Sequence, residues 1–277
     1  MLTSEQILLA AKRLDDAENN KQPIKPLTLV FAGMDMGDAY AIQKAWVEMK
    51  QARGDEITGY KIGLTSRAMQ QAMDIDTPDF GVLFESMRFV NGSTIKADDF
   101  LDPRIEAEFA FVMKSHLFGE DVSVEAVLDA TDYAVPALEL ISARSYRVDP
   151  DSGYTRNVFD TIADNAASAG YILGEERIDP NEVDLRWSGA LMYANGTIEE
   201  TGLGAAVMDH PARGISWVCK RFAQYGGGLE PGQTVLSGSF TRPIPVSSGT
   251  QIRADYGPFG DVSVCLLYTS PSPRDRG

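Results

Sequence analysis

Cysteine and histidine are scarce in this sequence of 277 residues, because each occurs only twice. Cys219 lies in the helical pattern "GISWVCKRFAQYG", where we expect a core residue rather than half of a disulfide. His116 falls in an expected loop and His210 precedes a proline, so both are expected to be surface or cap residues. The sequence therefore predicts neither a disulfide framework nor a role for histidine in metal binding.

Positive charge is also in short supply, since 25 lysines and arginines stand against 40 acidic residues and the net charge is −15. This balance excludes DNA, RNA and anionic membrane surfaces as partners, because each requires a positive patch. No run approaches the ~18 apolar residues of a membrane span, and the N-terminus is an amphipathic helical pattern rather than a signal peptide. We therefore expect a cytoplasmic protein whose small anionic ligands would need a local lysine, arginine or metal ion.

The remaining composition, 44% apolar and 23% charged, is typical of a globular protein. Apolar residues recur at helical spacing near the N-terminus, with Thr3 and Gln6 placed as a capping box, and a second helix is expected over 38–53. From residue 57 onward, short apolar runs alternate with turn signals, and helices are expected near 124–132 and 211–224. We predict an α+β protein with an N-terminal helical cap (1–56) and a sheet-based catalytic domain (57–264).

The C-terminal segment 265–277, "CLLYTSPSPRDRG", differs in composition from the rest of the chain. It resembles the translation of an adapter used in sequencing libraries, and we interpret it as a non-native tail. Its serine, proline and arginine content predicts that it lacks specific packing and contributes nothing to activity.

Two glutamates interrupt the strand-like stretch "RIEAEFAFV". Glu106 and Glu108 point to the same side of such a strand, about 7 Å apart. An exposed sheet face is the simpler explanation. Glu139 lies in the apolar run "YAVPALELI" and favours a different explanation of these glutamates, because a charge buried there needs a cationic partner.

A divalent metal ion would relieve the repulsion among these three glutamates. An oxygen-only ligand set favours Mg²⁺ or Mn²⁺ over Zn²⁺, and three carboxylates leave about half of an octahedral shell for water and substrate. A 2-oxo acid could chelate there through its carboxylate and keto oxygens. Structural ion pairs remain an alternative explanation of the same glutamates.

Two further residues are candidates for acid–base chemistry. Lys61 lies in "GYKIGLTS" between two glycines, Gly59 and Gly63, which permit close approach of a ligand. Taken by itself, a lysine that extends to solvent is the simpler interpretation. Asp79, in "DTPDFGVL", has the competing interpretation of a simple turn residue.

Six stretches together resemble the hydratase/decarboxylase branch of the fumarylacetoacetate hydrolase superfamily, and within it the 2-oxohept-4-ene-1,7-dioate hydratases of homoprotocatechuate degradation. They are "GYKIGLTSRAMQ", "TPDFGVLFESM", "DPRIEAEFAFV", "ATDYAVPALELISAR", "VFDTIADNAASAGYILG" and "GSFTRPIPV". The resemblance spans the first helix to about Val264. It implies a mixed β-sandwich roll with packed helices and a homo-oligomeric assembly.

The resemblance also implies a role for each candidate. Glu106, Glu108 and Glu139 match metal ligands, for Mg²⁺ or alternatively Mn²⁺, and Lys61 and Asp79 match residues that line the site. In "GSFTRP", Ser239 and Thr241 are candidates for binding a substrate carboxylate, although surface hydroxyls are more often structural. The distal carboxylate has three candidate partners that the sequence does not separate: Arg67, Arg144 and Arg156.

The implied reaction is the metal-dependent hydration of a small 2-oxo dicarboxylate, 2-oxohept-4-ene-1,7-dioate, to 4-hydroxy-2-oxoheptane-1,7-dioate in aromatic catabolism. Conjugation with the ketone makes C4 electrophilic toward water, and Lys61 and Asp79 are candidates for proton transfer. Three alternatives stay open: a 2-keto-4-pentenoate hydratase, a 4-oxalocrotonate decarboxylase, and a non-catalytic protein stabilised by a divalent cation.

Overall fold

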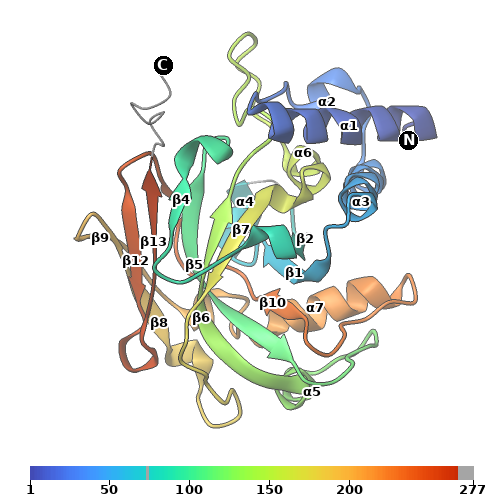
Figure 1. Ribbon diagram of the computed structural model, residues 1–277. Coiled ribbons are helices and arrows are strands. Elements are labelled where there is room, and N and C mark those ends of the chain that lie inside the picture. The colour runs from blue at the N-terminus through green and yellow to red at the C-terminus, as the bar shows by residue number, and fades with distance from the viewer. Residues whose placement is uncertain (73–74, 268–277) are drawn as a thin grey trace.

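The computed structural model describes residues 1–72 and 75–267. Within these ranges the strands form two sheets (Figure 1). The larger has the order β2-β1-β10-β5-β6-β7-β3, with β11 added to β5, and the smaller has the order β4-β13-β12-β8-β9. The strands are β1 (Ile57–Gly63), β2 (Asp79–Phe84), β3 (Arg88–Phe89), β4 (Thr94–Lys96), β5 (Arg104–Met113), β6 (Thr131–Ile141), β7 (Ser168–Leu173), β8 (Gly189–Ala194), β9 (Thr197–Leu203), β10 (Thr234–Leu236), β11 (Ile244–Pro245), β12 (Gln251–Asp255) and β13 (Asp261–Leu267).

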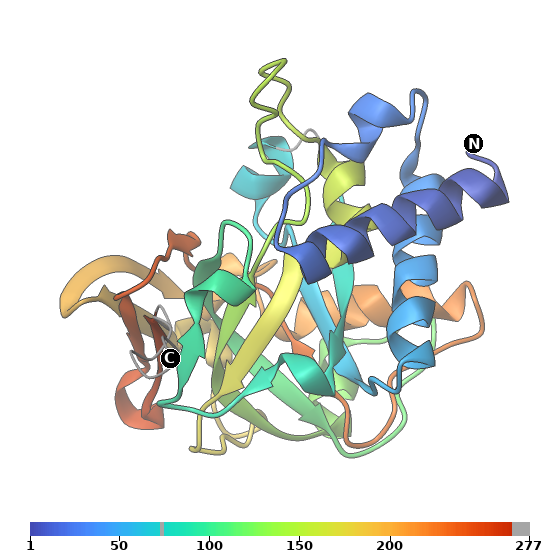
Figure 2. The same cartoon turned by 45° about the horizontal axis from the view of Figure 1, so that its top comes forward.

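Helices cover both faces of the larger sheet (Figures 1 and 2). The α-helices are α1 (Ser4–Asn20), α2 (Leu27–Val30), α3 (Met36–Ala52), α4 (Arg67–Ala72), α5 (Val124–Ala130), α6 (Val158–Ala163) and α7 (Ala212–Ala223). α1, α3 and α6 pack together over one face, while α5 and α7 lie with the smaller sheet on the other. No described helix has both the length and the apolar composition needed to cross a membrane.

The first helix begins at the predicted cap, and the second runs from Met36 to Ala52, close to the predicted 38–53. Thr3 and Gln6 form the capping box of α1, in which each side chain accepts a hydrogen bond from the other residue's backbone. α3 ends at Ala52, just before Gly54, whose φ of +89° is a conformation that glycine adopts without strain. α3 buries Ile42 and Trp46 against the larger sheet, so the N-terminal helices share a core with one face of that sheet.

The larger sheet separates two cores. Alternation along β5 sends Ile105, Ala107 and Phe109 into the core shared with the smaller sheet, α5 and α7. Ala110 faces the opposite way, into the core under α1, α3 and α6. The predicted α+β class and the predicted mixed sheet with packed helices are confirmed.

The prediction that the chain lacks specific packing after Val264 is wrong for residues 265–267. β13 continues through residues 265–267, where Cys265 pairs with Gln251 of β12 and with Thr94 of β4. Leu266 is fully buried, because the inward alternation of Val262 and Val264 continues through it. Residues 268–277 lie outside the described part of the chain, and the non-native origin of the segment stays a prediction.

Candidate metal centre and active site

The register of the larger sheet places the predicted site residues on one face. In the antiparallel pair of β5 and β6, Glu106 lies opposite Glu139. β10 links β5 to β1, since Leu236 pairs with both Ala110 and Lys61. Paired residues share a face, and so do alternate residues along a strand. The lysine of β1 and the glutamates of β5 and β6 therefore point to the same side.

Three carboxylates converge at this face. Glu106, Glu108 and Glu139 each offer an oxygen, and these oxygens all lie within 4.8 Å of one another. Glu108 and Glu139 are fully buried, so the interpretation of an exposed sheet face is wrong for Glu108. One oxygen of Glu108 accepts a 2.8 Å hydrogen bond from the backbone N–H of Gly238, whereas its other oxygen has no described partner.

Lys61 supplies positive charge to this cluster. Its Nζ lies 3.2 Å from Oε1 of Glu139, and the side chain is 4% exposed. The interpretation of a lysine that extends to solvent is therefore wrong. Burial alone would lower the pKa of Lys61, but the carboxylates around it, Glu139 first, raise that pKa above its ordinary value. Lys61 is therefore a protonated cation at neutral pH.

Asp79 begins β2 at the edge of the same site. It pairs with Gly63 of β1, and a Cβ added to Gly63 would lie 2.3 Å from an oxygen of Asp79. Both carboxylate oxygens are buried, with no hydrogen-bond partner in the described residues. Burial raises the pKa of Asp79 above its ordinary value, against the opposing charge of Lys61. Asp79 is therefore a buried titratable group with a perturbed pKa beside Lys61, and its role in proton transfer stays a prediction.

The glutamates of this cluster carry more negative charge than Lys61 can neutralise. This excess tests whether a divalent cation fits the site. Burial, and then the charge of Glu139, raise the pKa of Glu106 to about 8. The same causes raise the pKa of Glu108 well above its ordinary value. One lysine cannot neutralise two buried glutamates and a third that is half-buried, and carboxylate oxygens without partners are the ligands that hard divalent cations prefer. The residues present therefore fit Mg²⁺ or Mn²⁺; their role as ligands stays a prediction.

Ser239 and Thr241 lie beside the glutamates but are engaged with the backbone. Oγ of Ser239 lies 2.8 Å from the carbonyl oxygen of Thr241 and 3.2 Å from that of Ala107. The backbone N–H of Ala107 donates a 3.0 Å hydrogen bond to Oγ1 of Thr241. Both hydroxyls thus anchor β5 between its two glutamates, and their predicted contact with a substrate carboxylate stays untested.

Tyr256 is a positioning residue that sequence reasoning missed. Its buried hydroxyl lies 2.7 Å from the carbonyl oxygen of Ala137 and 2.8 Å from that of Glu108, and it accepts a 3.1 Å hydrogen bond from the N–H of Glu108. The tyrosine therefore ties β5 to β6 beside the three glutamates. It comes 148 residues after Glu108 in the chain, and no local pattern marks it.

The three arginines proposed for a distal carboxylate lie in different settings. Arg144 is fully occupied, because Glu18, Asp164 and the carbonyl oxygen of Ser168 bind its guanidinium. Arg67 is exposed at the start of α4. Arg156 is buried, yet its only described ion pair is a 3.5 Å contact with Asp164. Arg144 is therefore structural, while Arg67 and Arg156 remain candidates.

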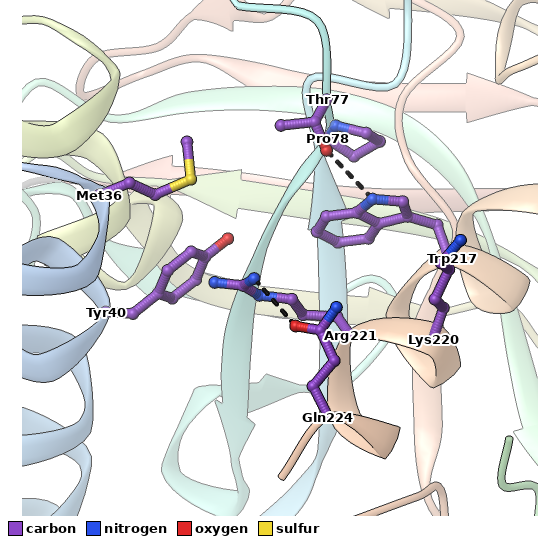
Figure 3. A pocket seen from close by; sticks show the side chains of 8 residues that line it. All are labelled: Met36, Tyr40, Thr77, Pro78, Trp217, Lys220, Arg221 and Gln224. Carbon is purple, nitrogen blue, oxygen red and sulfur yellow. Dashed lines mark hydrogen bonds between the residues drawn. The ribbon is translucent and has the colours of Figure 1, made fainter. Parts of the chain in front are cut away.

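A small cavity of about 180 Å³ lies between α3 and α7 (Figure 3). On one side, the indole N–H of Trp217 donates a 3.1 Å hydrogen bond to Oγ1 of Thr77. On the other, the guanidinium of Arg221 lies over the ring of Tyr40. The residues that line this cavity do not include any of the predicted site residues, so it is separate from the carboxylate cluster.

Known proteins share this fold and much of this sequence. The 2-oxo-hept-4-ene-1,7-dioate hydratase of Escherichia coli is 49% identical over 255 residues, 92% of this chain and 96% of that protein. The 2-keto-4-pentenoate hydratase of Paraburkholderia xenovorans (strain LB400) is 35% identical over 94% of this chain and 95% of that protein. The structure of 4-oxalocrotonate decarboxylase from Pseudomonas putida G7, complexed with magnesium and adipate, superposes with a TM-score of 0.91 at 33% identity, covering 96% of this chain and 99% of that one.

These likenesses define the class of the protein. No protein-family model matches the chain. Identity this high over nearly the whole length nevertheless shows common descent, and the superposition shows that the fold is shared. The chain belongs to the hydratase/decarboxylase branch of the fumarylacetoacetate hydrolase superfamily.

Proposed function

We propose that this protein hydrates 2-oxohept-4-ene-1,7-dioate to 4-hydroxy-2-oxoheptane-1,7-dioate with a divalent cation, preferably Mg²⁺. The observation that carries the proposal is the convergence of Glu106 with the buried Glu108 and Glu139 beside the cation of Lys61. Membership of a family with a hydratase relative at 49% identity supports the choice of substrate. The magnesium-bound decarboxylase structure supports the choice of metal.

The three glutamates would hold the cation. When bound, such a cation chelates the C1 carboxylate and the C2 oxygen of a 2-oxo acid and polarises the ketone. The substrate's double bond must first shift into conjugation with that ketone, which moves a proton from C3 to C5. Water then adds across C3 and C4, with its oxygen on C4 and a proton on C3.

Lys61 and Asp79 divide the work of charge and proton transfer. The raised pKa of Lys61 keeps it protonated, so it stabilises the negative charge that develops on the C2 oxygen during enolisation. Asp79 lacks hydrogen-bond partners among the described residues and has a raised pKa, so it is the better group to take up and return the proton that moves. Both side chains are buried, which limits the exchange of their protons with bulk water.

Decarboxylation of 4-oxalocrotonate is the second candidate, since a decarboxylase shares the fold and the same enolate chemistry. Its identity of 33% is lower than the 49% of the hydratase relative, which favours hydration. A 2-keto-4-pentenoate hydratase would use the same steps on a shorter acid. A non-catalytic role is disfavoured by Lys61 and Asp79, because a structural metal site gains nothing from an adjacent cation and an unbonded carboxyl group.

Product analysis tests the proposal. The purified protein, treated with chelator and then supplied with Mg²⁺, is mixed with 2-hydroxyhepta-2,4-diene-1,7-dioate, and loss of ultraviolet absorbance is followed. The expected product is the 4-hydroxy-2-oxo acid, one water heavier than the substrate, and no turnover is expected before Mg²⁺ is added. A decarboxylase is tested in parallel with 4-oxalocrotonate, whose release of carbon dioxide at a higher kcat/KM would overturn the assignment.

We further propose a homo-oligomer, which the family resemblance implies. Light scattering on the eluting peak of a sizing column measures the assembly directly. A mass equal to that of one chain across micromolar concentrations would contradict this proposal.

A further inference from the structure

We propose that Arg104, Arg147 and Arg156 form a binding site for the distal carboxylate of a dicarboxylate substrate. These three residues are called the arginine cluster below. The inference rests on the proposed function, because it takes the C1 end of the substrate to lie at the glutamates. It goes further by naming the residues that would distinguish a dicarboxylic from a monocarboxylic 2-oxo acid.

The position of Arg104 sets the distance from the metal centre. Arg104 precedes Glu106 by two residues on β5 with no break in register, so both side chains leave the same face. Their Cα atoms are therefore about 7 Å apart. An extended seven-carbon dioate spans roughly 7.5 Å between its carboxyl carbons, given single bonds of about 1.5 Å and angles near 111°. A substrate chelated at the glutamates can thus reach the arginine cluster.

The other two arginines come from the loop of residues 142–157, which follows the strand that carries Glu139 (Figure 1). The two arms of this loop pair with each other, as the backbone N–H of Arg156 donates a 3.0 Å hydrogen bond to the carbonyl oxygen of Arg147. Arg147 and Arg104 both approach Asp102, Arg147 through Nε and Arg104 at 3.5 Å. Asp102 thus contacts arginine side chains from two separate elements, β5 and the loop of residues 142–157.

The arginine cluster has more donors than its own carboxylates can satisfy. Nε of Arg104 is buried without a hydrogen-bond partner in the described residues. Asp102 is 54% exposed and is shared by two arginines, and Asp164 lies closer to Arg144, at 3.0 Å, than to Arg156, at 3.5 Å. A guanidinium fork with unused donors is suited to bidentate binding of another carboxylate.

The positive charges of the arginine cluster oppose one another. Burial lowers the pKa of Arg156 to about 10 against the opposing charge of Asp164, and Arg147 contributes to the lowering. Burial and the charge of Arg104 lower the pKa of Arg147. The charge of Arg156 opposes the rise in the pKa of Asp79, which places this guanidinium near Asp79. An anion bound here would relieve the repulsion. Local positive charge of this kind is unusual in a chain with a net charge of −15.

A pair of inert ligands of equal length tests the inference by binding alone. Titration calorimetry compares 2-oxoheptane-1,7-dioate with 2-oxoheptanoate on the Mg²⁺-loaded protein; the two differ only in the distal carboxylate. We expect the dioate to bind about 10- to 100-fold more tightly, the gain typical of charge-assisted hydrogen bonds. Arg147→Met and Arg156→Met should each reduce that ratio by about tenfold.

The control is Arg186→Met, which removes an arginine paired with Asp184 at the surface and should keep the ratio of the wild-type protein. If Arg156→Met does not fold, Arg147→Met decides, because its side chain is 24% exposed. Equal affinities for the two ligands in the wild-type protein would overturn the inference. An affinity ratio that is unchanged in Arg147→Met would also overturn it. So would a ratio that is lost only in Arg67→Met, because that result would place the distal carboxylate at α4.

The test separates the two proposals. A protein that prefers the dioate but hydrates no dienoate would refute the proposed function and leave the binding site in place. A protein that hydrates the dienoate with no preference for a distal carboxylate would refute the binding site alone.

Discussion

Glu106 and Glu139 are direct cross-strand partners in the antiparallel pair of β5 and β6. Like charges in this position, about 5 Å apart at Cβ, destabilise a sheet. Burial makes the cost larger, since neither carboxylate can be fully solvated. Local rules of stability are broken in this way chiefly at functional sites, where a ligand offsets the cost.

Replacing Glu108 is predicted to affect the stability of the metal-free and the metal-loaded protein in opposite ways. Glu108→Gln removes one of three mutually repelling carboxylates, so the metal-free variant should unfold at a temperature equal to or above that of the metal-free wild-type protein. Saturating Mg²⁺ should raise the melting temperature of the wild-type protein by several degrees and that of the variant by much less. Differential scanning calorimetry with chelator or Mg²⁺ measures both effects.

The exposed Glu120 provides the control, because Glu120→Gln should leave the response to Mg²⁺ intact. A Glu108→Gln protein that is stabilised by Mg²⁺ as strongly as the wild-type protein would remove Glu108 from the proposed ligand set.

Lys61→Met separates catalysis from binding. If Lys61 stabilises the developing enolate, the variant should lose about 10²–10⁴ in kcat while oxalate, an analogue of the chelating end, inhibits it nearly as well as it inhibits the wild-type enzyme. Steady-state kinetics with oxalate inhibition provide the measurement, and the exposed Lys114→Met is the control. A raised KM with unchanged kcat would show that Lys61 only attracts the anionic substrate and takes no part in catalysis.

Tyr256→Phe should weaken the tie between β5 and β6. The variant loses a hydroxyl that bridges the backbones of Glu108 and Ala137, and it leaves buried polar groups without that partner. Its free energy of unfolding in urea should fall by about 1–3 kcal/mol. Its affinity for Mg²⁺ should fall as well, because Glu108 is less firmly positioned. A loss of stability without any change in metal affinity would show that Tyr256 serves the fold alone.

The ion pairs of Glu18 predict how the free energy of unfolding depends on pH. It accepts ion pairs from Lys50 at 2.7 Å and Arg144 at 3.0 Å. Although burial opposes the shift, Arg144 and Lys50 lower its pKa from 4.5 to about 2. A folded-state pKa below the unfolded value stabilises the protein above pH 4.5, and that stabilisation is lost as the pH falls from 4.5 toward 2.

Glu18→Gln should therefore reduce the free energy of unfolding at pH 7, by up to about 3 kcal/mol, and the difference from the wild-type protein should shrink below pH 4.5. Urea titrations at a series of pH values measure this difference. The exposed Glu48→Gln should show no comparable trend. A constant difference between pH 7 and pH 3 would contradict the lowered pKa.

Alternation and apolar context were enough to single out the glutamates, because both are local properties of the sequence. Glu106 and Glu108 share a strand face by spacing, and Glu139 stands out among apolar neighbours. Their convergence depends on strand register, which is set by contacts between distant segments. The resemblance to a family implied that convergence, but spacing alone could not.

The residues that support the site were harder to predict. Tyr256 reaches the metal centre from a turn after β12, and the N–H of Gly238 reaches Glu108 from 130 residues away. Arg104 was visible in the sequence as the first residue of its strand, but only the folded loop of residues 142–157 brings other arginines beside it. The end of β13 was misplaced because residues of unusual composition were assumed to end the strand pattern.

Metal-dependent turnover of the Glu139→Gln variant tests the central claim most directly. Wild-type and variant proteins are stripped with chelator, titrated with Mg²⁺, and assayed for hydration of 2-hydroxyhepta-2,4-diene-1,7-dioate with product identification. We predict that the wild-type protein gains activity in proportion to bound Mg²⁺, and that Glu139→Gln binds the metal poorly and forms no 4-hydroxy-2-oxo product. Full hydration by the metal-free wild-type protein, or by Glu139→Gln, would contradict the account.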